Sequence, residues 1–307
     1  MKGLLGRLPG LAWAKRMVRQ GAQGLTRRIA SQLDLDLVRK TPYSPVPTVP
    51  PPSSPEWERA SPLAGITLDP AAQLGWLEAT LAPHLAELCS RVAPPDGDLR
   101  LDLRNGYYQL VDAALLWAMV RHFRPRRLLE LGAGFSTLIS AAACAANARE
   151  DDAVELVSVD PEPRIGLAPV LPGLTRLERR SAAELPLDRF LALEANDILF
   201  IDTTHTVKRG SEVNYLVLEV LPCLRAGVVV HFHDIFLPYE YPREWFAAGT
   251  YLAEQYLLQA FLIENDTYEI LFAAHAVSRA LPARLAKVIP LFDPTTVGQE
   301  AFWMRRR

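Results

Sequence analysis

The amino-acid sequence predicts an α/β protein with a mostly parallel sheet. A short apolar run at 127–131 enters the turn Gly132-Ala133-Gly134, and a helical stretch follows at once. Further short apolar runs then alternate with helical segments, and they cover residues 154–159, 174–178, 197–201 and 228–232. Strands that alternate with helices are joined by right-handed crossovers and form a parallel sheet. We therefore expect a doubly wound sheet flanked by helices.

Composition and charge fit a globular protein with a large core. The chain has 307 residues, of which 50% are apolar and 22% charged, and its net charge of −2 does not indicate nucleic-acid binding. No uninterrupted apolar stretch resembles a signal peptide, which favours the cytoplasm. Cys89, Cys144 and Cys223 are too far apart for a zinc motif or a disulfide framework, and we expect the last two to be buried on apolar helix faces.

The chain divides into five predicted regions. Residues 1–41 are a basic amphipathic segment, since positions 1–40 hold nine Lys or Arg against two Asp. Such a segment can lie on an anionic membrane, contact a partner, or pack on its own domain. The regions that follow are a linker at 42–55 with seven prolines, a helical cap region at 56–104, the α/β domain at 105–278 and a C-terminal extension at 279–307.

Apolar periodicity predicts the remaining elements. Residues 267–274 and 277–278 are the candidates for the final strands of the sheet. The predicted helices cover 54–89, 105–123, 211–224 and 251–264.

Polar residues recur where the predicted strands end. A ligand in an open α/β sheet lies at the carboxyl ends of the strands. The residues expected there are Glu130, the turn at 132–134, Asp160, 181–184, 202–205 and 231–234. Asp160 can accept both hydroxyls of a ribose, but Thr137 stands where the dinucleotide fingerprint has its third glycine. A ligand with a ribose and no phosphates is therefore favoured over NAD.

The chain resembles class I S-adenosylmethionine (SAM)-dependent methyltransferases. It is most similar to the group that contains small-molecule and sugar O-methyltransferases and cephalosporin-hydroxylase-like proteins. The resemblance runs from about Asn105 to Ala276 and depends on the segments LLELGAGFST, VELVSVDPEP, ILFIDTTHTVKRGSEVNYLVLEVLPCLRAG and VVVHFHDIFLPYEYP. It implies a Rossmann-like, mostly parallel seven-stranded sheet flanked by helices, with an N-terminal helical extension.

The resemblance also implies a set of cofactor contacts. Glu130, Gly132 and Gly134 would surround the methionine part of SAM, and Asp160 would hold the ribose hydroxyls. Asp202 would lie beneath the reacting methyl group. The other expected contacts are Ala133, Ser136, Ser181, Ala182 and, less directly, Glu184.

A protonated hydroxyl is a poor nucleophile, so methyl transfer to oxygen needs a base or a metal. His205 and His233 are the candidate bases, and Asp202 would orient one of them. In the metal version Asp202, Asp234 and His233 are the ligands, and the imidazole favours Mn²⁺, Fe²⁺ or Zn²⁺ over Mg²⁺. We expect His231 to be a packed strand residue that points away from His233.

The segment after Asp234 holds Tyr239, Tyr241 and Trp245. These rings either cover the acceptor pocket or pack as a surface loop. Asn105, Tyr107 and Tyr108 can close over the cofactor.

The sequence thus predicts methyl transfer from SAM to a hydroxyl of a small molecule of the sugar or secondary-metabolite type. One alternative is a cephalosporin-hydroxylase-like or NAD-linked oxidoreductase. Another is a non-catalytic scaffold that contacts a membrane through residues 1–40. Either a monomer or a homo-oligomer is compatible with the sequence.

Overall fold

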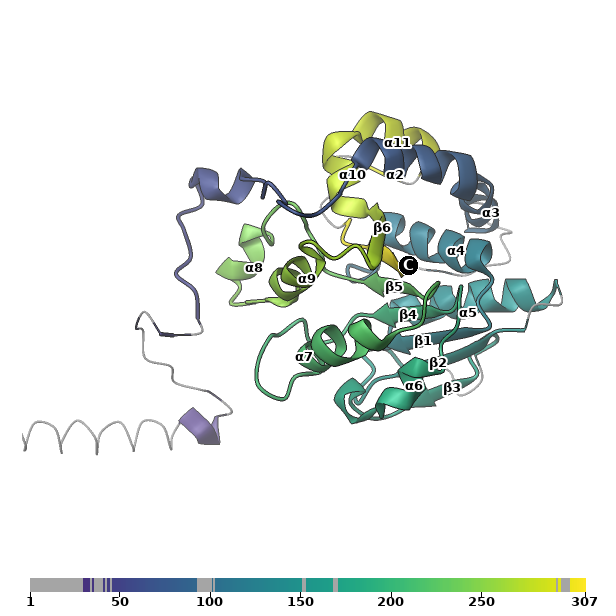
Figure 1. Ribbon diagram of the computed structural model, residues 1–307, viewed down its shortest axis with the longest axis horizontal. Coiled ribbons are helices and arrows are strands. Elements are labelled where there is room, and N and C mark those ends of the chain that lie inside the picture. The colour runs from purple at the N-terminus through teal and green to yellow at the C-terminus, as the bar shows by residue number, and fades with distance from the viewer. Residues whose placement is uncertain are drawn as a thin grey trace, which may run out of the picture. The chain divides into compact units, whose positions relative to one another are not determined.

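A computed structural model describes most of the chain. The described residues are 30–33, 35, 41, 43, 44, 46–92, 101, 103–150, 153–167, 171–290, 292, 293 and 299–307. The chain forms two compact units, residues 1–49 and 50–307. The basic segment predicted at 1–41 lies almost entirely outside the described residues, and so does part of the linker. The second unit carries the sheet and the helices discussed below (Figure 1).

A seven-stranded sheet organises this unit, in the order β3-β2-β1-β4-β5-β7-β6. The strands are β1 (Arg127–Leu131), β2 (Glu155–Val159), β3 (Arg176–Glu178), β4 (Ile198–Ile201), β5 (Val229–Phe232), β6 (Tyr268–Ala273) and β7 (Phe302–Arg306). β1 to β5 pair in parallel, while β7 pairs antiparallel with both β5 and β6. The predicted mostly parallel seven-stranded sheet flanked by helices is confirmed.

Helices cover both faces of the sheet, because neighbouring strand residues point to opposite sides. Leu128 packs into the core on one face and Leu129 into the core on the other. The first face is covered by α2 (Pro70–Trp76), η2 (Leu77–Leu81), α3 (Ala82–Val92), α4 (Leu110–Phe123), α5 (Phe135–Ala148), α10 (Ala274–Ala280) and α11 (Pro282–Val288). The second is covered by α6 (Leu187–Leu191), α7 (Glu212–Tyr215), η4 (Leu216–Val220), η5 (Leu221–Cys223) and α9 (Glu254–Leu262). Both faces are buried, so the strands read as continuous apolar runs.

The helix predicted at 54–89 starts later than expected. Residues Pro55–Glu58 form the short helix η1, and the continuous helical stretch begins only at Pro70. There the Asp69 carboxylate caps the backbone N–H groups of Ala71 and Ala72 at 2.9 and 3.0 Å. α4 likewise begins at Leu110 rather than at 105, because the Asn105 side chain accepts from two following backbone N–H groups and forms a turn.

The prediction of a final strand at 277–278 is wrong. Those residues belong to α10, and the seventh strand is β7 at the end of the chain. Phe302, Trp303 and Met304 are fully buried in it. Three arginines follow these residues, so the segment does not read as an apolar strand in the sequence. Only the apolar first half of β7 enters the core.

The cysteines are free, with Cys144 buried as predicted. Cys223, predicted to be buried, is exposed. Within the described parts of the chain, no helix has both the length and the apolarity needed to cross a bilayer.

Candidate active site

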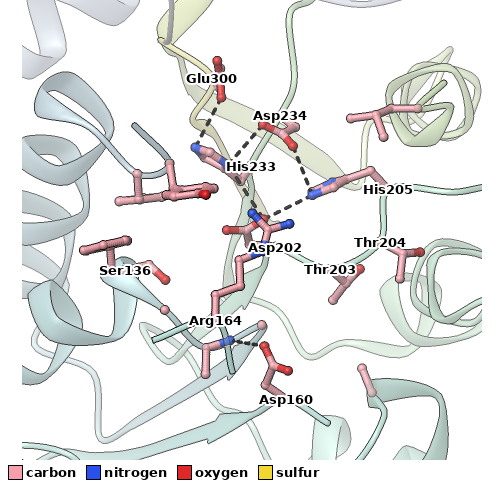
Figure 2. Close-up of a pocket in the computed structure, with 18 of the residues that line it drawn as sticks. Ser136, Asp160, Arg164, Asp202, Thr203, Thr204, His205, His233, Asp234 and Glu300 are labelled. Carbon is pink, nitrogen blue, oxygen red and sulfur yellow. Dashed lines mark hydrogen bonds and ion pairs between the residues drawn. The ribbon is translucent and has the colours of Figure 1, made fainter. Parts of the chain in front are cut away.

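A cavity of about 800 Å³ opens at the carboxyl ends of the parallel strands. It is continuous from the glycine turn after β1 to the loop after β5 (Figure 2). Most residues predicted for the site line it: Gly132, Ala133, Gly134, Ser136, Asp160, Ser181, Ala182, Asp202, His205, His233 and Asp234. The topology thus brings together side chains that lie up to about a hundred positions apart in the sequence.

In the turn after β1, the backbone of Gly132 lies against the backbone of Asp202. Gly132 has φ +92°, and a Cβ built on it would lie 1.8 Å from the carbonyl oxygen of Asp202. The Gly134 N–H donates to Thr137 Oγ1 at 3.0 Å. Thr137 therefore caps the start of α5, at the position where a dinucleotide site has a glycine. The turn is rigid and exposes its backbone to the cavity.

Asp160 joins the end of β2 to this turn. Its Oδ2 accepts from the Ala133 N–H at 2.8 Å and its Oδ1 from the Glu162 N–H at 2.7 Å. The carboxylate stays partly exposed at the cavity wall. It is thereby held in place with lone pairs that remain available to a ligand.

Glu130 is fully buried beneath the turn and is not part of the cavity wall. Its Oε1 accepts from Ser136 Oγ at 2.8 Å, and its Oε2 accepts from Ser158 Oγ. Burial raises the pKa of Glu130 to about 7, against these hydrogen bonds, which lower it. In this structure Glu130 supports the turn from below.

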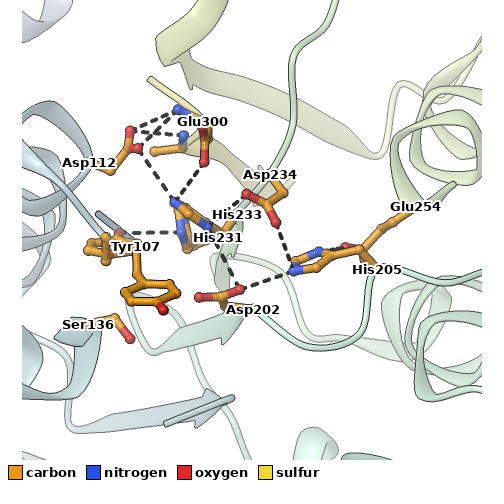
Figure 3. A network of polar contacts seen from close by, with 12 residues as sticks. Tyr107, Asp112, Ser136, Asp202, His205, His231, His233, Asp234, Glu254 and Glu300 are labelled. Carbon is orange, nitrogen blue, oxygen red and sulfur yellow. Dashed lines mark hydrogen bonds and ion pairs between the residues drawn. The ribbon is translucent and has the colours of Figure 1, made fainter. Parts of the chain in front are cut away.

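The end of the cavity near the loops after β4 and β5 carries a group of carboxylates and imidazoles that we call the polar cluster (Figure 3). Its members are Asp112, Asp202, His205, His233, Asp234, Glu254 and Glu300. They come from α4, the loops after β4 and β5, the first turn of α9 and the residue before Ala301. Five carboxyl groups around two imidazoles favour cationic partners.

His205 uses both of its ring nitrogens within the polar cluster. Nδ1 lies 2.7 Å from Glu254 Oε2, while Nε2 lies 3.1 Å from Asp202 Oδ1 and 3.2 Å from Asp234 Oδ2. Burial alone would lower the pKa of His205, but Asp234 and the other two carboxylates raise it well above its usual value. With both ring N–H groups donating, His205 links three carboxylates.

His233 stands between two pairs of carboxyl groups. Nδ1 lies 3.3 Å from Asp234 Oδ1 and 3.8 Å from Asp202 Oδ1. Nε2 faces Asp112 and Glu300 at 3.5 and 3.7 Å and makes no hydrogen bond in the described part of the chain. Burial opposes protonation, but Asp202 and Asp234 outweigh it and raise the pKa of His233 well above the usual value.

The expectation that His231 and His233 point to opposite faces is wrong. Residues two apart on a strand share a face, and Tyr108 touches both rings, at 6.2 Å from His231 and 4.8 Å from His233 between ring centroids. His231 is nevertheless a packed residue, as predicted. It is fully buried between Phe200 and Trp303.

Two sets of three side chains have the donor groups of a metal site. Asp202, His233 and Asp234 each offer a ligand atom, and all three atoms lie within 4.8 Å of one another. Asp112, His233 and Glu300 form the second set. The first set is the predicted one, faces the cavity, and combines carboxylate with imidazole, as sites for Mn²⁺, Fe²⁺ or Zn²⁺ do.

The aromatic loop is only partly in the site. Trp245 of α8 (Arg243–Ala247) lines the cavity, whereas Tyr241 is buried and Tyr239 packs against His275. Tyr107 and Tyr108 also line the cavity, whereas Asn105 does not. Ser181 and Ala182 belong to its wall, while Glu184 is exposed and does not.

Asp112, Glu254 and Glu300 were not predicted. No motif marks them, since Asp112 reads as a polar position in an apolar helix and the other two as surface glutamates. The sequence signal for Asp112 is its place among apolar neighbours. In the structure its side chain is 1% exposed.

Residues 129–235 match a family model described as a methyltransferase domain. A stretch of 102 residues is 31% identical to an uncharacterized protein from Archaeoglobus fulgidus, and this match covers 32% of the chain and 44% of that protein. The match therefore spans less than half the length of that relative.

Two solved structures are similar at low identity. One is CmcI with Mg and SAM, at 16% identity over 71% of this chain and 86% of that one, with a TM-score of 0.39. The other is an O-methyltransferase from Bacillus cereus in complex with S-adenosylhomocysteine (SAH), at 14% identity over 79% and 93%, with a TM-score of 0.34. Because both TM-scores are below 0.5, the domain assignment depends on the family match.

Proposed function

From the premise that residues 129–235 form a methyltransferase domain, we propose that this protein transfers a methyl group from SAM to a hydroxyl oxygen of a small molecule. The observation that carries the proposal is the continuity of the cavity. One end is lined by the glycine turn and Asp160, and the other by Asp202 and His233. A cofactor bound at the first end would point its reactive methyl group at the second.

The cofactor half suits a ligand with a ribose and a sulfonium. Asp160 keeps lone pairs free at the cavity wall, and a carboxylate can accept from both ribose hydroxyls. The acidic lining of the other half favours the positive charge of the sulfonium. These features support SAM over NAD, whose pyrophosphate is an anion.

The acceptor half suits a hydroxyl. Methyl transfer needs the acceptor oxygen, the methyl carbon and the sulfur in line, with the oxygen roughly 3–3.5 Å from the carbon. His205 is a poor base, because both of its ring nitrogens already donate to carboxylates. His233 is the better choice, since its ring lines the cavity and its shortest contact with a carboxylate is 3.3 Å. A sulfonium nearby opposes the imidazolium form and so favours a neutral ring that can take the proton.

A divalent metal fits the same end of the cavity. Asp202, His233 and Asp234 would hold it, and the excess of carboxylates over imidazoles leaves negative charge for a cation to balance. Bound there, the metal would lower the pKa of a coordinated acceptor hydroxyl. The role of the chain would be to hold the two aspartates together through His205.

Calorimetry with SAH tests the cofactor half. We expect Asp160→Ala to weaken SAH binding about 100-fold, the loss of about 3 kcal/mol from two hydrogen bonds to a charged acceptor. Asp188→Ala, which removes an exposed carboxylate outside the cavity lining, is the matched control and should bind as the wild type does. If the wild-type protein binds neither SAM nor SAH, the proposal is wrong.

The transfer itself requires a separate assay. The purified protein is incubated with methyl-labelled SAM and panels of phenols, sugars and carboxylic acids, and label is sought in each product. We expect label in hydroxyl compounds and its loss in His233→Ala. Transfer only to carboxylic acids or amines would contradict the hydroxyl acceptor while leaving the cofactor proposal intact. Dialysed protein that contains stoichiometric iron and oxidises a substrate would instead favour the hydroxylase alternative.

A further inference from the structure

The first turn of α9 ties together the two loops that carry the polar cluster. Glu254 and Gln255 stand side by side in this turn, and both are buried. Glu254 Oε2 accepts from His205 Nδ1 in the loop after β4. Gln255 Oε1 accepts from the Phe236 N–H, and the Gln255 N–H donates to Tyr241 Oη, both at 3.0 Å and both in the loop after β5. One helical turn therefore holds Asp202 and Asp234 through their own loops.

The contact with His205 is reciprocal. The His205 carbonyl oxygen accepts from the backbone N–H groups of Ala253 and Glu254, at 2.9 and 3.1 Å. His205 has φ +54°, a conformation that residues other than glycine rarely adopt. Such a backbone persists only where surrounding contacts hold it. The start of α9 supplies these contacts to both the main chain and the ring.

The orientation of the ring follows from these bonds. With Nδ1–H directed at Glu254, Nε2–H points at Asp202 Oδ1 and Asp234 Oδ2 (Figure 3). Rotating the ring by half a turn would place carbon atoms against these oxygens. Glu254 therefore sets the ring orientation in which Nε2–H joins Asp202, which follows β4, to Asp234, which lies after β5.

We propose that Glu254 is a positioning residue of the active site, which acts through His205 to keep Asp202 and Asp234 together at the acceptor end of the cavity. The meaning of this inference rests on the proposed function, because these aspartates matter as acceptor or metal contacts. A packing role does not account for Glu254. Its side chain is fully buried and its Oε1 has no hydrogen-bond partner in the described part of the chain, so an apolar residue would be the less costly occupant.

Histidine-selective ¹⁵N NMR of the full chain tests the proposal without acceptor or cofactor. The two ring N–H signals of His205 are assigned by their absence in His205→Asn. We expect both signals in the wild type, with slow exchange with water. In Glu254→Leu we expect at least tenfold faster exchange for both. In Glu254→Gln, whose amide oxygen can still accept from Nδ1–H, exchange should stay within about threefold of the wild type.

Glu219→Leu is the matched control, since it removes an exposed glutamate from the helical stretch η4. It should leave both His205 signals unchanged. Unaltered exchange in Glu254→Leu, or a wild type without slowly exchanging His205 signals, would overturn the proposal. If Glu254→Leu does not fold, Glu254→Gln still decides. Its neutral acceptor should move the Nδ1–H resonance upfield, and a residue that only fills space would leave that resonance in place.

SAH calorimetry on the same samples separates this inference from the proposed function. Glu254 is not part of the cavity wall, and the glycine turn and Asp160 are held by hydrogen bonds of their own. We therefore expect SAH affinity within twofold of the wild type in both variants. Faster exchange of the His205 signals in Glu254→Leu, with intact SAH binding, supports the inference. Absent SAH binding in the wild type counts against the proposed function alone.

Discussion

Gly132→Ala is the sharpest test of how the glycine turn after β1 is built. The added Cβ would lie 1.8 Å from the Asp202 carbonyl oxygen and 2.9 Å from its carbonyl carbon. Both are backbone atoms, so no flexible side chain can swing away. Asp202 is also anchored, since its N–H donates to the Leu131 carbonyl at 2.9 Å. The substitution must therefore push the turn and the end of β4 apart by more than 1 Å, given that Cβ contacts below 3.0 Å essentially do not occur.

Two costs add up in this variant. Alanine at φ +92° occupies an unfavourable backbone region, which costs about 1–3 kcal/mol. Displacing packed backbone costs about 1–3 kcal/mol more. Together they lower the free energy of unfolding by about 4 kcal/mol, and the melting temperature of a domain of this size by about 8–16 °C. SAH binding should fall as well, because the turn and Asp202 both line the cavity.

Gly134→Ala is the matched control in the same turn. Gly134 has φ −172°, an extended conformation open to any residue, and a Cβ built on it meets no atom within 4 Å. We expect a melting temperature within 2 °C of the wild type. SAH affinity should still fall, because the new methyl group enters the part of the cavity that the proposed cofactor would fill. Scanning calorimetry and isothermal titration measure the two effects. Equal melting temperatures for the two alanine variants would refute the close approach of Gly132 to Asp202.

Three further predictions concern buried groups. Glu130 has a pKa of about 7 in the folded protein against 4.5 when unfolded, so the free energy of unfolding falls as pH rises from 4.5 to 7. In urea denaturation, Glu130→Gln should therefore be as stable as the wild type at pH 4 and about 3 kcal/mol more stable at pH 8. A stability difference that does not change with pH would contradict this. The Asp112 carboxylate accepts from two backbone N–H groups before β7. Measured by urea denaturation, Asp112→Ala should lower the free energy of unfolding by about 3 kcal/mol, and Asp112→Asn should lower it less. Equal losses of stability in the two variants would argue against these hydrogen bonds. A thiol reagent should modify Cys223 quickly and Cys144 only in denaturant, because burial raises the pKa of the Cys144 thiol and shields it from the reagent. Fast modification of both cysteines would contradict the burial of Cys144.

The sheet could be predicted because each parallel strand is buried on both faces. β1, β2, β4 and β5 all read as short apolar runs followed by polar residues, and most of the carboxyl-end positions predicted from that pattern line the cavity. Glu130, Glu184 and His231 are exceptions. β7 escaped because its partners are far away in the sequence. β7 lies between β5 and β6 in the sheet. Pairing with these two strands makes the apolar segment Phe302-Trp303-Met304 a strand.

The two histidines at the end of β5 share one face of the sheet. They are two residues apart, so both side chains project toward Tyr108, which lies just before α4. His231 is buried and His233 lines the cavity because the two residues lie at different distances from the end of the strand. His231 lies inside β5, whereas His233 lies one residue past its end. The distance from the strand end, and not the face, separates a packed imidazole from a site imidazole here.

The polar cluster itself lies beyond what a single sequence can reveal. Motif spacing located His205, because Asp202 precedes it by three residues on the same loop. Glu254 reaches that imidazole from 49 positions away, and Asp112 and Glu300 approach His233 from opposite ends of the domain. None of the three has a local neighbour that explains its burial. A buried carboxylate is stable only beside a donor or a cation, so each of them implies the imidazole it contacts. Because Glu254 is inaccessible to water, its carboxylate needs the His205 ring N–H, and each of the two side chains holds the other in place.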